Sequence, residues 1–289
     1  MHAEITMTDS GDAKETESAD VRGILYSLLA NAFRYPDDTL LKTLLDPQRW
    51  SALPPLVRGL DAESAAQLEA IGERWVEPIR AGSTGFDDDA LQNTYVHLFG
   101  HTVRGTCPMY ELEYGRGEII QQTSILADIA GFYSAFGMEL TGQGNERPDH
   151  VTVECEFMSI LAAKEAYAMR HEDDAEAREI LKDAQRSFLE EHLARWLPSL
   201  LRRITEADPN GFYGAMASFG DAFLDSECRR YDVPRGSKLL ELRPVDPTHD
   251  ANINCGPEAC VPAGQASPLV QLGIDASQQS PADGGPASE

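Results

Sequence analysis

Apolar residues recur along this chain at the three- and four-residue spacing of helices that bury one face. Between Asp20 and Pro36 one apolar stripe comprises Ile24, Leu25, Leu28, Leu29, Ala32 and Phe33. Asp20 is suited to cap such a helix, and Pro36 is suited to end it. The same reasoning predicts further helices over about 37–45, 61–80, 87–99, 117–136, 151–169, 174–189, 191–205 and 211–230.

Strand signals are missing from this pattern. We find no set of alternating apolar and polar runs bounded by turn residues, and no repeat at a fixed period. The Pro54-Pro55 pair predicts a loop, and the Gly-rich stretch 141–145 predicts a connection between helices. The sequence therefore predicts an all-α fold, a single globular helical-bundle domain of about nine or ten helices.

Composition changes along the chain and predicts three parts. Residues 1–19 are polar and acidic, which favours a disordered arm, and residues 20–240 carry the helical pattern. Residues 241–289 are expected to form a flexible tail, because Pro, Gly, Ser, Ala and Gln dominate from Pro244 onward. This tail contains Cys255 and Cys260, with His249 nearby, and either a zinc or redox role or an unremarkable tail fits that spacing.

The net charge of the chain limits the classes of partner that we expect. Lys and Arg number 24 against 48 Asp and Glu, for a formal net charge of −24. Nucleic acids and anionic membranes are bound mainly through Lys and Arg, so neither is an expected partner, whereas a basic peptide is compatible. No apolar run approaches the roughly 18–20 residues that span a bilayer. The first twenty residues lack a basic and an apolar region, so we expect no signal peptide and a cytoplasmic location.

Chemistry-bearing residues concentrate in the segment Glu146-Arg147-Pro148-Asp149-His150, where a helix is expected to start. Pro148 suits the turn before a helix. Asp149 can accept hydrogen bonds from the free amides of the first turn, and the helix dipole favours its charge. A carboxylate next to His150 can move the pKa of its imidazole across neutrality. A plain helix cap with an incidental histidine is the simpler alternative.

A second candidate segment is the loop Cys107-Pro-Met-Tyr-Glu-Leu-Glu-Tyr114, which combines aromatic rings, a methionine and two carboxylates. Such residues suit the lip of a peptide-binding groove, because rings supply contact area and carboxylates pair with arginine. A loop packed against the core fits equally well. Tyr95, Leu98 and Phe99 share one helical face just before this loop, as core residues also do.

Catalytic alternatives find little support. His150 could act as a base oriented by Asp149, but adjacent residues on a helix point about 100° apart. Cys107 could be a nucleophile with His97 or His101, yet its loop offers only Arg104 to lower the thiol pKa. A metal pair formed by His97 and His101 is interrupted by Gly100, and no phosphate-binding motif occurs. We therefore expect neither an enzyme nor a bound metal or cofactor.

Three elements occur in a fixed order along the chain: Tyr95-x-x-Leu98-Phe99, then Pro108-x-Tyr110-Glu111-x-x-Tyr114, then Glu146-Arg147-Pro148-Asp149-His150 with Glu154, Phe157 and Met158 behind it. This combination resembles the TorD/DmsD/NarJ family of redox-enzyme maturation chaperones, nearest the TorD-like branch, over roughly residues 20–230. The loop departs from the family pattern, reading Pro-Met-Tyr-Glu-Leu-Glu-Tyr where Pro-Tyr-Glu-Ser-x-Tyr is more usual. The tail lies outside the resemblance, although it is similar to tails of chaperones that serve type II molybdoenzymes.

The resemblance implies a cytoplasmic chaperone for the catalytic subunit of a dimethyl-sulfoxide-reductase-superfamily molybdoenzyme. Such a protein binds the client's twin-arginine signal peptide, its apo-form, or both until the molybdopterin cofactor is inserted. The alternative is a NarJ-like scaffold that binds only the folded apo-enzyme. The family's binding positions correspond here to Tyr95, Leu98, Phe99, Pro108, Tyr110, Glu111, Tyr114, Asp149 and His150.

Side-chain chemistry adds two residues to this set. A twin-arginine segment followed by an apolar stretch needs carboxylates beside an apolar groove, which adds Glu113 and Met109. The protein is expected to be a monomer or a dimer that exchanges helices, with a hinge at about residues 138–148.

Overall fold

The computed structural model describes residues 3–80, 88–100, 105–115, 119–140, 146–171, 175–244 and 269–271. Its α-helices are α1 (Ala3–Ala32), α2 (Asp38–Leu44), α3 (Pro47–Ser51), α4 (Leu53–Val57), α5 (Ala62–Arg80), α6 (Asp88–Phe99), α7 (Ile119–Ala135), α8 (Val151–Arg170), α9 (Ala175–Phe188), α10 (Ala194–Ala207) and α11 (Phe212–Tyr231). A 3₁₀ turn (Glu111–Glu113), a π-helical turn (Leu189–Leu193) and two short strands complete the described elements. The all-α prediction is confirmed, and nine of the helices in the described ranges span seven residues or more.

Helix α1 corrects the sequence prediction at its N-terminus. The helix begins at Ala3, whereas we expected a disordered arm up to residue 19 and a helix start at Asp20. Strong helix formers such as Ala13, Lys14 and Glu15 continue the helix through this polar stretch. Packing supports it as well, because Ala19 is fully buried and Lys182 of α9 lies 3.9 Å from the carboxylate of Glu15.

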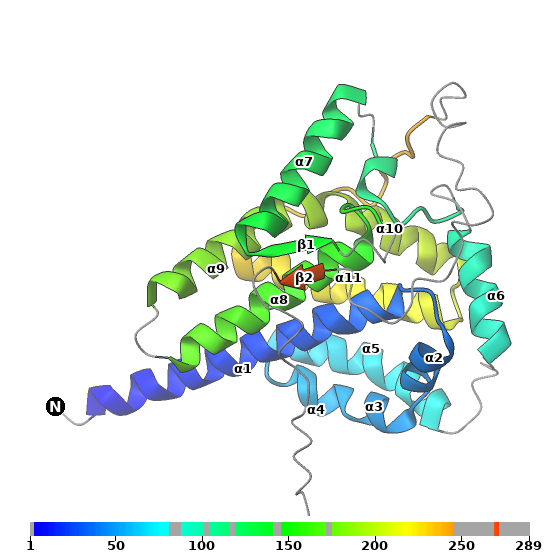
Figure 1. The fold of residues 1–289 in the computed structure, drawn as a ribbon. Coiled ribbons are helices and arrows are strands. Elements are labelled where there is room, and N and C mark those ends of the chain that lie inside the picture. The colour runs from blue at the N-terminus through cyan, green and yellow to red at the C-terminus, as the bar shows by residue number, and fades with distance from the viewer. Residues whose placement is uncertain are drawn as a thin grey trace, which may run out of the picture.

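The core forms where α1 lies alongside α8 (Figure 1). Close approach is possible because position 23 is glycine: a Cβ there would meet the Ser159 carbonyl oxygen at 3.3 Å. The Ser159 hydroxyl donates to the Gly23 carbonyl at 2.8 Å, which joins the two helices at the same point. The predicted stripe of α1 is buried with one exception, since Ile24 is 50% exposed.

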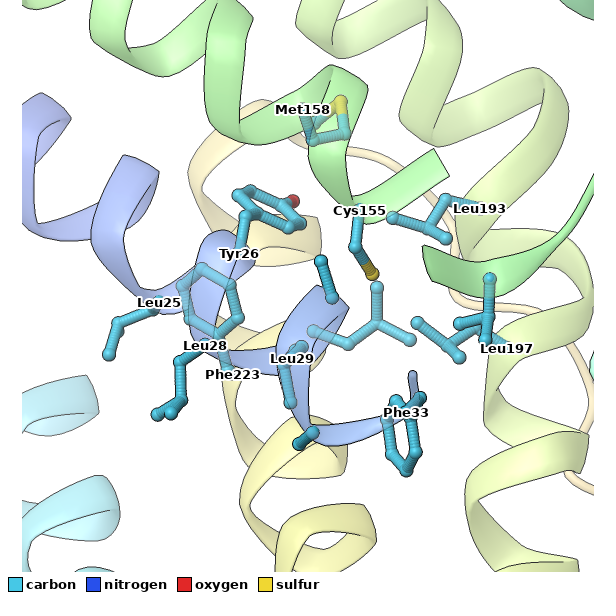
Figure 2. Close-up of a cluster of buried hydrophobic side chains, with 14 of the residues drawn as sticks. Leu25, Tyr26, Leu28, Leu29, Phe33, Cys155, Met158, Leu193, Leu197 and Phe223 are labelled. Atoms are coloured by element: carbon cyan, nitrogen blue, oxygen red, sulfur yellow. The ribbon is translucent and has the colours of Figure 1, made fainter. Parts of the chain in front are cut away.

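Figure 2 shows how this stripe meets side chains from other helices. Cys155 and Met158 come from α8, Leu197 from α10, and Phe223 from α11. The ring of Phe223 meets that of Tyr26 edge to face, with centroids 4.8 Å apart. Each fully buried side chain of this size contributes about 1.5–3 kcal/mol of transfer free energy, so the cluster is a major source of stability.

The short helices α2 to α4 follow from local capping. Asp37 caps α2 by accepting from the amides of Thr39 and Leu40. The loop predicted at Pro54-Pro55 is wrong, because both prolines lie in the first turn of α4. The amides of a first turn have no partner within the helix, so prolines there lose no hydrogen bond.

Helices α9 and α10 are continuous rather than separated by a break near residue 190. The π-helical turn Leu189–Leu193 joins them. Pro198 within α10 cannot donate to the Ala194 carbonyl four residues earlier. The amide of Gly236 donates to that carbonyl instead, at 2.9 Å. Only glycine fits at 236, since a Cβ there would lie 2.3 Å from the Arg195 carbonyl oxygen.

The two strands, β1 (Met138–Leu140) and β2 (Leu269–Gln271), pair antiparallel. Just before the undescribed stretch, Leu242 bridges to Tyr114 and the Arg243 amide donates to the Glu113 carbonyl at 2.9 Å. The Gly-rich connection at 141–145 and the residues Cys255, Cys260 and His249 lie outside the described residues. Among the helices in the described ranges, none has the length and apolar character needed to cross a membrane.

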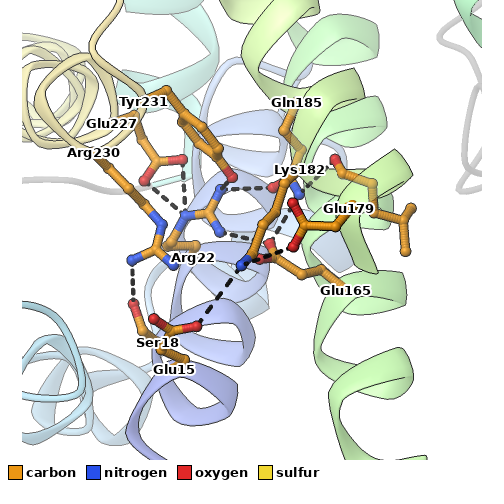
Figure 3. Close-up of polar contacts among 11 residues, drawn as sticks. Glu15, Ser18, Arg22, Glu165, Glu179, Lys182, Gln185, Glu227, Arg230 and Tyr231 are labelled. Atoms are coloured by element: carbon orange, nitrogen blue, oxygen red, sulfur yellow. Dashed lines mark hydrogen bonds and ion pairs between the residues drawn. The ribbon is translucent and has the colours of Figure 1, made fainter. Parts of the chain in front are cut away.

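A buried arginine joins four helices (Figure 3). Arg22 of α1 donates to Glu227 of α11 at 2.8 Å and to Glu165 of α8 at 3.0 Å. It also donates to Gln185 of α9 and to the Tyr231 hydroxyl of α11. Burial alone would lower the pKa of Arg22, but Glu227 and its neighbours outweigh burial and raise it well above the usual value. The cation is therefore held charged without contact with water.

We predict that Arg22→Leu lowers the free energy of unfolding by about 3–5 kcal/mol, because it leaves Glu165 and Glu227 buried without a cation. Arg58→Leu is the matched control: Arg58 pairs with Glu69 on the surface, and little change is expected. Urea unfolding followed by circular dichroism measures both. Adding Glu165→Gln and Glu227→Gln to Arg22→Leu should recover part of the loss, and an unchanged loss would contradict a charge-based role.

Candidate functional site

The two predicted segments meet in the structure. Loop residues 107–114 lie against residues 146–151, so that Tyr110 and His150 form an antiparallel bridge. The Glu111 amide donates to the Asp149 carbonyl, and the Val151 amide donates to the Met109 carbonyl, both at 2.9 Å. This backbone pairing fixes the loop over the first turn of α8, although the two segments are about forty positions apart in the sequence.

His150, and not Asp149, is the N-cap of α8. Its Nδ1 accepts from the Thr152 amide at 3.2 Å and lies 2.7 Å from the Thr152 hydroxyl oxygen. Burial lowers the pKa of His150, against the opposite pull of Glu146 and Asp149. The imidazole is therefore held neutral, which keeps Nδ1 available as the acceptor that a cap requires.

Asp149 is fully buried, and its partners are internal. Arg147 donates to its two carboxylate oxygens from Nε at 2.9 Å and from Nη2 at 2.6 Å. The Leu112 amide donates to it as well, at 3.2 Å. Asp149 thus joins the loop to the segment before α8, and the predicted interaction with the first-turn amides is corrected. The start of α8 was predicted correctly, but the side chain that caps it was not.

Tyr110 is the half-buried residue of the loop. Its ring packs edge to face on the His150 ring, with centroids 4.8 Å apart, and the Arg147 guanidinium lies 4.7 Å above its centroid. Its hydroxyl donates to the Glu146 carboxylate at 3.2 Å. The Glu146 side chain is 34% exposed and lies 3.7 Å from His150 Nε2. Glu146 is thus more accessible than Glu111, Glu113 or Asp149.

The other two predicted carboxylates are buried and paired. Glu111 lies 3.1 Å from His192 Nδ1, and the opposite nitrogen of that ring is 3.3 Å from Asp128. Glu113 lies 3.5 Å from the Arg243 guanidinium. The structure therefore places Glu113 and Asp149 in internal ion pairs with arginines, and Glu111 in contact with a buried histidine.

The remaining predicted residues support the loop from below. The Tyr114 hydroxyl donates to the Pro108 carbonyl at 2.7 Å, and the Tyr114 ring packs on Trp196 of α10. Met109 is buried, and the Cys107 amide donates to the Leu98 carbonyl at 2.9 Å, which fastens the loop to α6.

Tyr95, Leu98 and Phe99 are buried on α6. The rings of Tyr95 and Phe99 contact each other and the ring of Tyr213. Burial raises the pKa of Tyr95, and the nearby Glu146 raises it further. Of the residues predicted to contact a client, Tyr110 is the one that is not buried.

An apolar groove lies elsewhere on the described surface. It has a volume of about 750 Å³ and lies between α1, α3, α4 and α8, where Ile24, Leu28, Trp50 and Leu53 line it. None of the residues predicted to line a client groove belongs to it. The polar cluster at the start of α8 and this groove are therefore separate features.

The structure also bears on the catalytic alternatives. Burial raises the pKa of the Cys107 thiol to about 11, so the thiol is protonated at neutral pH. His97 is exposed on α6, whereas His101 and Arg104 lie outside the described residues. Among the residues that the structure describes, no group of three or more His, Cys, Asp or Glu is arranged to hold a metal ion.

The sequence did not indicate the roles of several residues of the cluster: the partly exposed carboxylate Glu146, and His192, Asp128, Arg243 and Trp196 as partners of its buried groups. Trp196 Nε1 donates to Glu154 at 3.0 Å. Only Glu146 carried a signal, since it belongs to the charged segment before α8. Asp128 comes from α7, His192 from the π-helical turn, Trp196 from α10, and Arg243 from the segment that follows α11. Nothing in their local sequence indicates that they converge here.

We predict that His150→Asn is about 1 kcal/mol more stable than His150→Ala, because asparagine can still cap α8. Both variants lose the ring contact with Tyr110, so their difference isolates the cap. Urea unfolding at neutral pH measures it. Equal stability of the two variants would show that the hydrogen bond to the Thr152 amide contributes nothing.

A pH dependence is predicted for Glu154. Burial and the nearby Glu111 raise its pKa well above 4.5, so the folded protein retains a proton that the unfolded chain releases. Stability contributed by this group is therefore lost as pH rises above about 4.5. Glu154→Gln should become more stable relative to the unchanged protein by up to about 1.4 kcal/mol per pH unit.

Thermal unfolding between pH 5 and pH 8 measures the difference in stability between Glu154→Gln and the unchanged protein. Glu179→Gln serves as the control, since Glu179 is exposed on α9 and should show no such divergence. A gap that stays constant or narrows with rising pH would contradict the raised pKa.

Comparisons with known proteins place this chain in a family. A sequence model described as nitrate reductase delta subunit matches residues 58–202. The perchlorate reductase assembly chaperone protein of Dechloromonas aromatica (strain RCB) is 26% identical over 224 residues, which cover 76% of this chain and 94% of that protein. The chlorate reductase assembly chaperone protein of Ideonella dechloratans is 31% identical over 160 residues, which cover 53% of this chain and 77% of that protein.

The selenate reductase assembly chaperone protein of Thauera selenatis is 38% identical over 98 residues, which cover 34% of this chain and 47% of that protein. No solved structure shows a significant match. The matched residues 58–202 include both segments that meet at the start of α8. The resemblance stated from the sequence is thus confirmed, and the chain belongs to the nitrate reductase delta subunit family of TorD- and NarJ-like assembly chaperones.

Proposed function

We propose that this protein is a cytoplasmic assembly chaperone that binds the catalytic subunit of a molybdopterin oxidoreductase before its cofactor is inserted. Relatives that match much of the chain bear the names of assembly chaperones for perchlorate and chlorate reductases, which supports this class of client. The protein itself acts as a binder that needs no cofactor and performs no catalysis. The client feature that it recognises is the twin-arginine signal peptide, its apo-form, or both.

One observation carries the proposal of signal-peptide recognition: the partly exposed Glu146 carboxylate accepts a hydrogen bond from Tyr110 and lies beside its ring. Glu146 is fixed by the Tyr110 hydroxyl and lies near His150 Nε2. An incoming guanidinium can pair with Glu146 and stack on the exposed part of the Tyr110 ring. The net charge of −24 attracts a basic segment toward this surface over longer distances.

The buried residues of the cluster have a different role in this proposal. Glu113 and Asp149 are paired with Arg243 and Arg147, and Glu111 lies against His192, so all three position the loop and leave Glu146 to make the contact. Moving a buried carboxylate to a client arginine would require breaking an ion pair that water cannot replace. The residues predicted from the sequence therefore act mainly as the framework of the binding surface.

A second mode deserves the same test, because the family model is that of the nitrate reductase delta subunit. In this NarJ-like mode the chaperone binds the folded apo-enzyme and uses no signal peptide. The oligomeric state is part of the proposal too: a monomer or a helix-exchanged dimer would each present the same surface. Light scattering after size exclusion distinguishes them.

We predict that Glu146→Gln weakens binding of a generic twin-arginine signal peptide at least about tenfold, because a charge-assisted hydrogen bond contributes about 1.5–3 kcal/mol. Asp183→Asn on α9 removes the same charge from an exposed position and should bind like the unchanged protein. Calorimetric titration measures both, with a peptide whose two arginines are replaced by lysine as a second comparison.

The lysine peptide should bind more weakly than the arginine peptide, and Glu146→Gln should reduce that preference. Equal binding by Glu146→Gln and Asp183→Asn would contradict recognition at Glu146. Absence of any peptide binding, together with capture of the apo-enzyme, would favour the NarJ-like mode.

A further inference from the structure

We propose that the edge of β1 is a docking site for an extended, basic and apolar peptide, and that the tail strand β2 occupies this edge until the peptide displaces it. The inference rests on the proposed function only for the origin of that peptide, which is the client. The pairing of β2 with the β1 edge concerns this chain alone. A strand can dock in this way because an edge offers backbone hydrogen bonds to any chain of suitable shape.

The occupied edge is already present in the structure. Met138, Glu139 and Leu140 lie opposite Gln271, Val270 and Leu269 respectively, in antiparallel register. β2 comes from the far C-terminal part of the chain, and it contacts α8 as well as β1 (Figure 1). An extended segment bound here therefore lies against the helix whose first turn forms the polar cluster.

The strand β1 is firmly held by the body of the protein. Met138 is buried, and Leu140 packs against the core. The Lys164 ammonium of α8 donates to the Phe136 carbonyl at 3.1 Å, just before the strand. In the preceding helix the Tyr133 hydroxyl donates to the Pro148 carbonyl at 2.7 Å. The acceptor edge is therefore preorganised and joined to the Glu146–His150 segment.

The charge on β1 indicates which peptide fits best. Glu139 is exposed, and its cross-strand partner Val270 is uncharged. Within the described ranges Glu139 forms no ion pair. Opposite charges directly across an antiparallel pair attract, so an arginine or lysine at the position of Val270 suits this edge better than the tail does. A basic residue between two apolar ones is the pattern that follows.

The tail strand is suited to be displaced. Two paired strands of three residues each make a marginal sheet, which depends on what it packs against. The tail holds its place chiefly because tethering gives it a high effective concentration near β1. A client peptide whose basic segment is bound at Glu146 of the same chain gains the same advantage.

The test uses the full-length chain with three substitutions. Val270→Pro disfavours pairing of β2, because proline has no amide hydrogen to donate to a ladder, Val270→Arg places a cation opposite Glu139, and Gln278→Pro is a control elsewhere in the tail. Hydrogen exchange at the amides of residues 138–140 reports whether the edge is covered. Fluorescence anisotropy with a labelled generic twin-arginine signal peptide reports docking, and circular dichroism checks the fold.

We expect Val270→Pro to speed exchange at residues 138–140 at least tenfold and to bind the labelled peptide at least threefold more tightly. Val270→Arg should slow exchange at residues 138–140 and weaken binding of the labelled peptide. Gln278→Pro should match the unchanged protein in both measurements. Unchanged exchange in Val270→Pro would overturn the tail's role. Faster exchange without tighter binding would overturn docking of the client at this edge.

A second probe separates this inference from the proposed function. The synthetic peptide Ser-Pro-Leu-Val-Gln-Leu-Gly, which corresponds to residues 267–273, should restore slow exchange when added to the Val270→Pro protein. If it does so while the signal peptide binds no variant, the edge accepts strands and the client assignment fails. If it does not, the docking edge itself is refuted.

Discussion

The packing of this bundle depends on one guanidinium that has no contact with water. Arg22 reaches α8, α9 and α11 from α1, so four helices must arrive together before its charge is satisfied. Apolar packing between these helices tolerates small slips, whereas an arginine with buried carboxylate partners does not. The cation thus fixes the relative positions of helices whose apolar faces could pack in more than one way. The close approach of α1 to α8 at Gly23 then follows within that frame.

The site at the start of α8 uses the same physical device at a smaller scale. Each buried carboxylate of the cluster has a partner: Glu111 lies against His192, Glu113 against Arg243, and Asp149 against Arg147 two residues earlier. Such pairs contribute little net stability, since desolvation offsets their attraction, but they permit few alternative arrangements. The consequence is that Glu146 stays partly exposed while Glu111, Glu113 and Asp149 are buried.

Helical periodicity was sufficient to predict the longer helices, because burial of one face dominates their sequence pattern. It failed where local propensity or contacts distant in the sequence determine the secondary structure or the partner of a side chain. Polar residues before Asp20 form helix because their intrinsic propensity is high, and Pro54-Pro55 is helical because a first turn needs no amide donors. The two segments of the candidate site, which the structure brings together, were selected from their residue types. Their partners His192 and Arg243 could not be, since a residue's local sequence does not record which distant carboxylate it meets. For the same reason Asp149 was predicted to cap α8. Its carboxylate is instead paired with Arg147, and His150 is the cap.

The π-helical turn between α9 and α10 shows how one long helix serves two neighbours. A π turn holds more residues than an α turn, so side chains after Leu193 are rotated about the axis relative to those before Leu189. The apolar face of α9 is directed at α8, and that of α10 at α11. Without the turn, one straight apolar stripe would face one side only, and a loop would be needed to redirect it. The chain changes partners here within one continuous helix, and His192 of the π-helical turn lies 3.1 Å from Glu111.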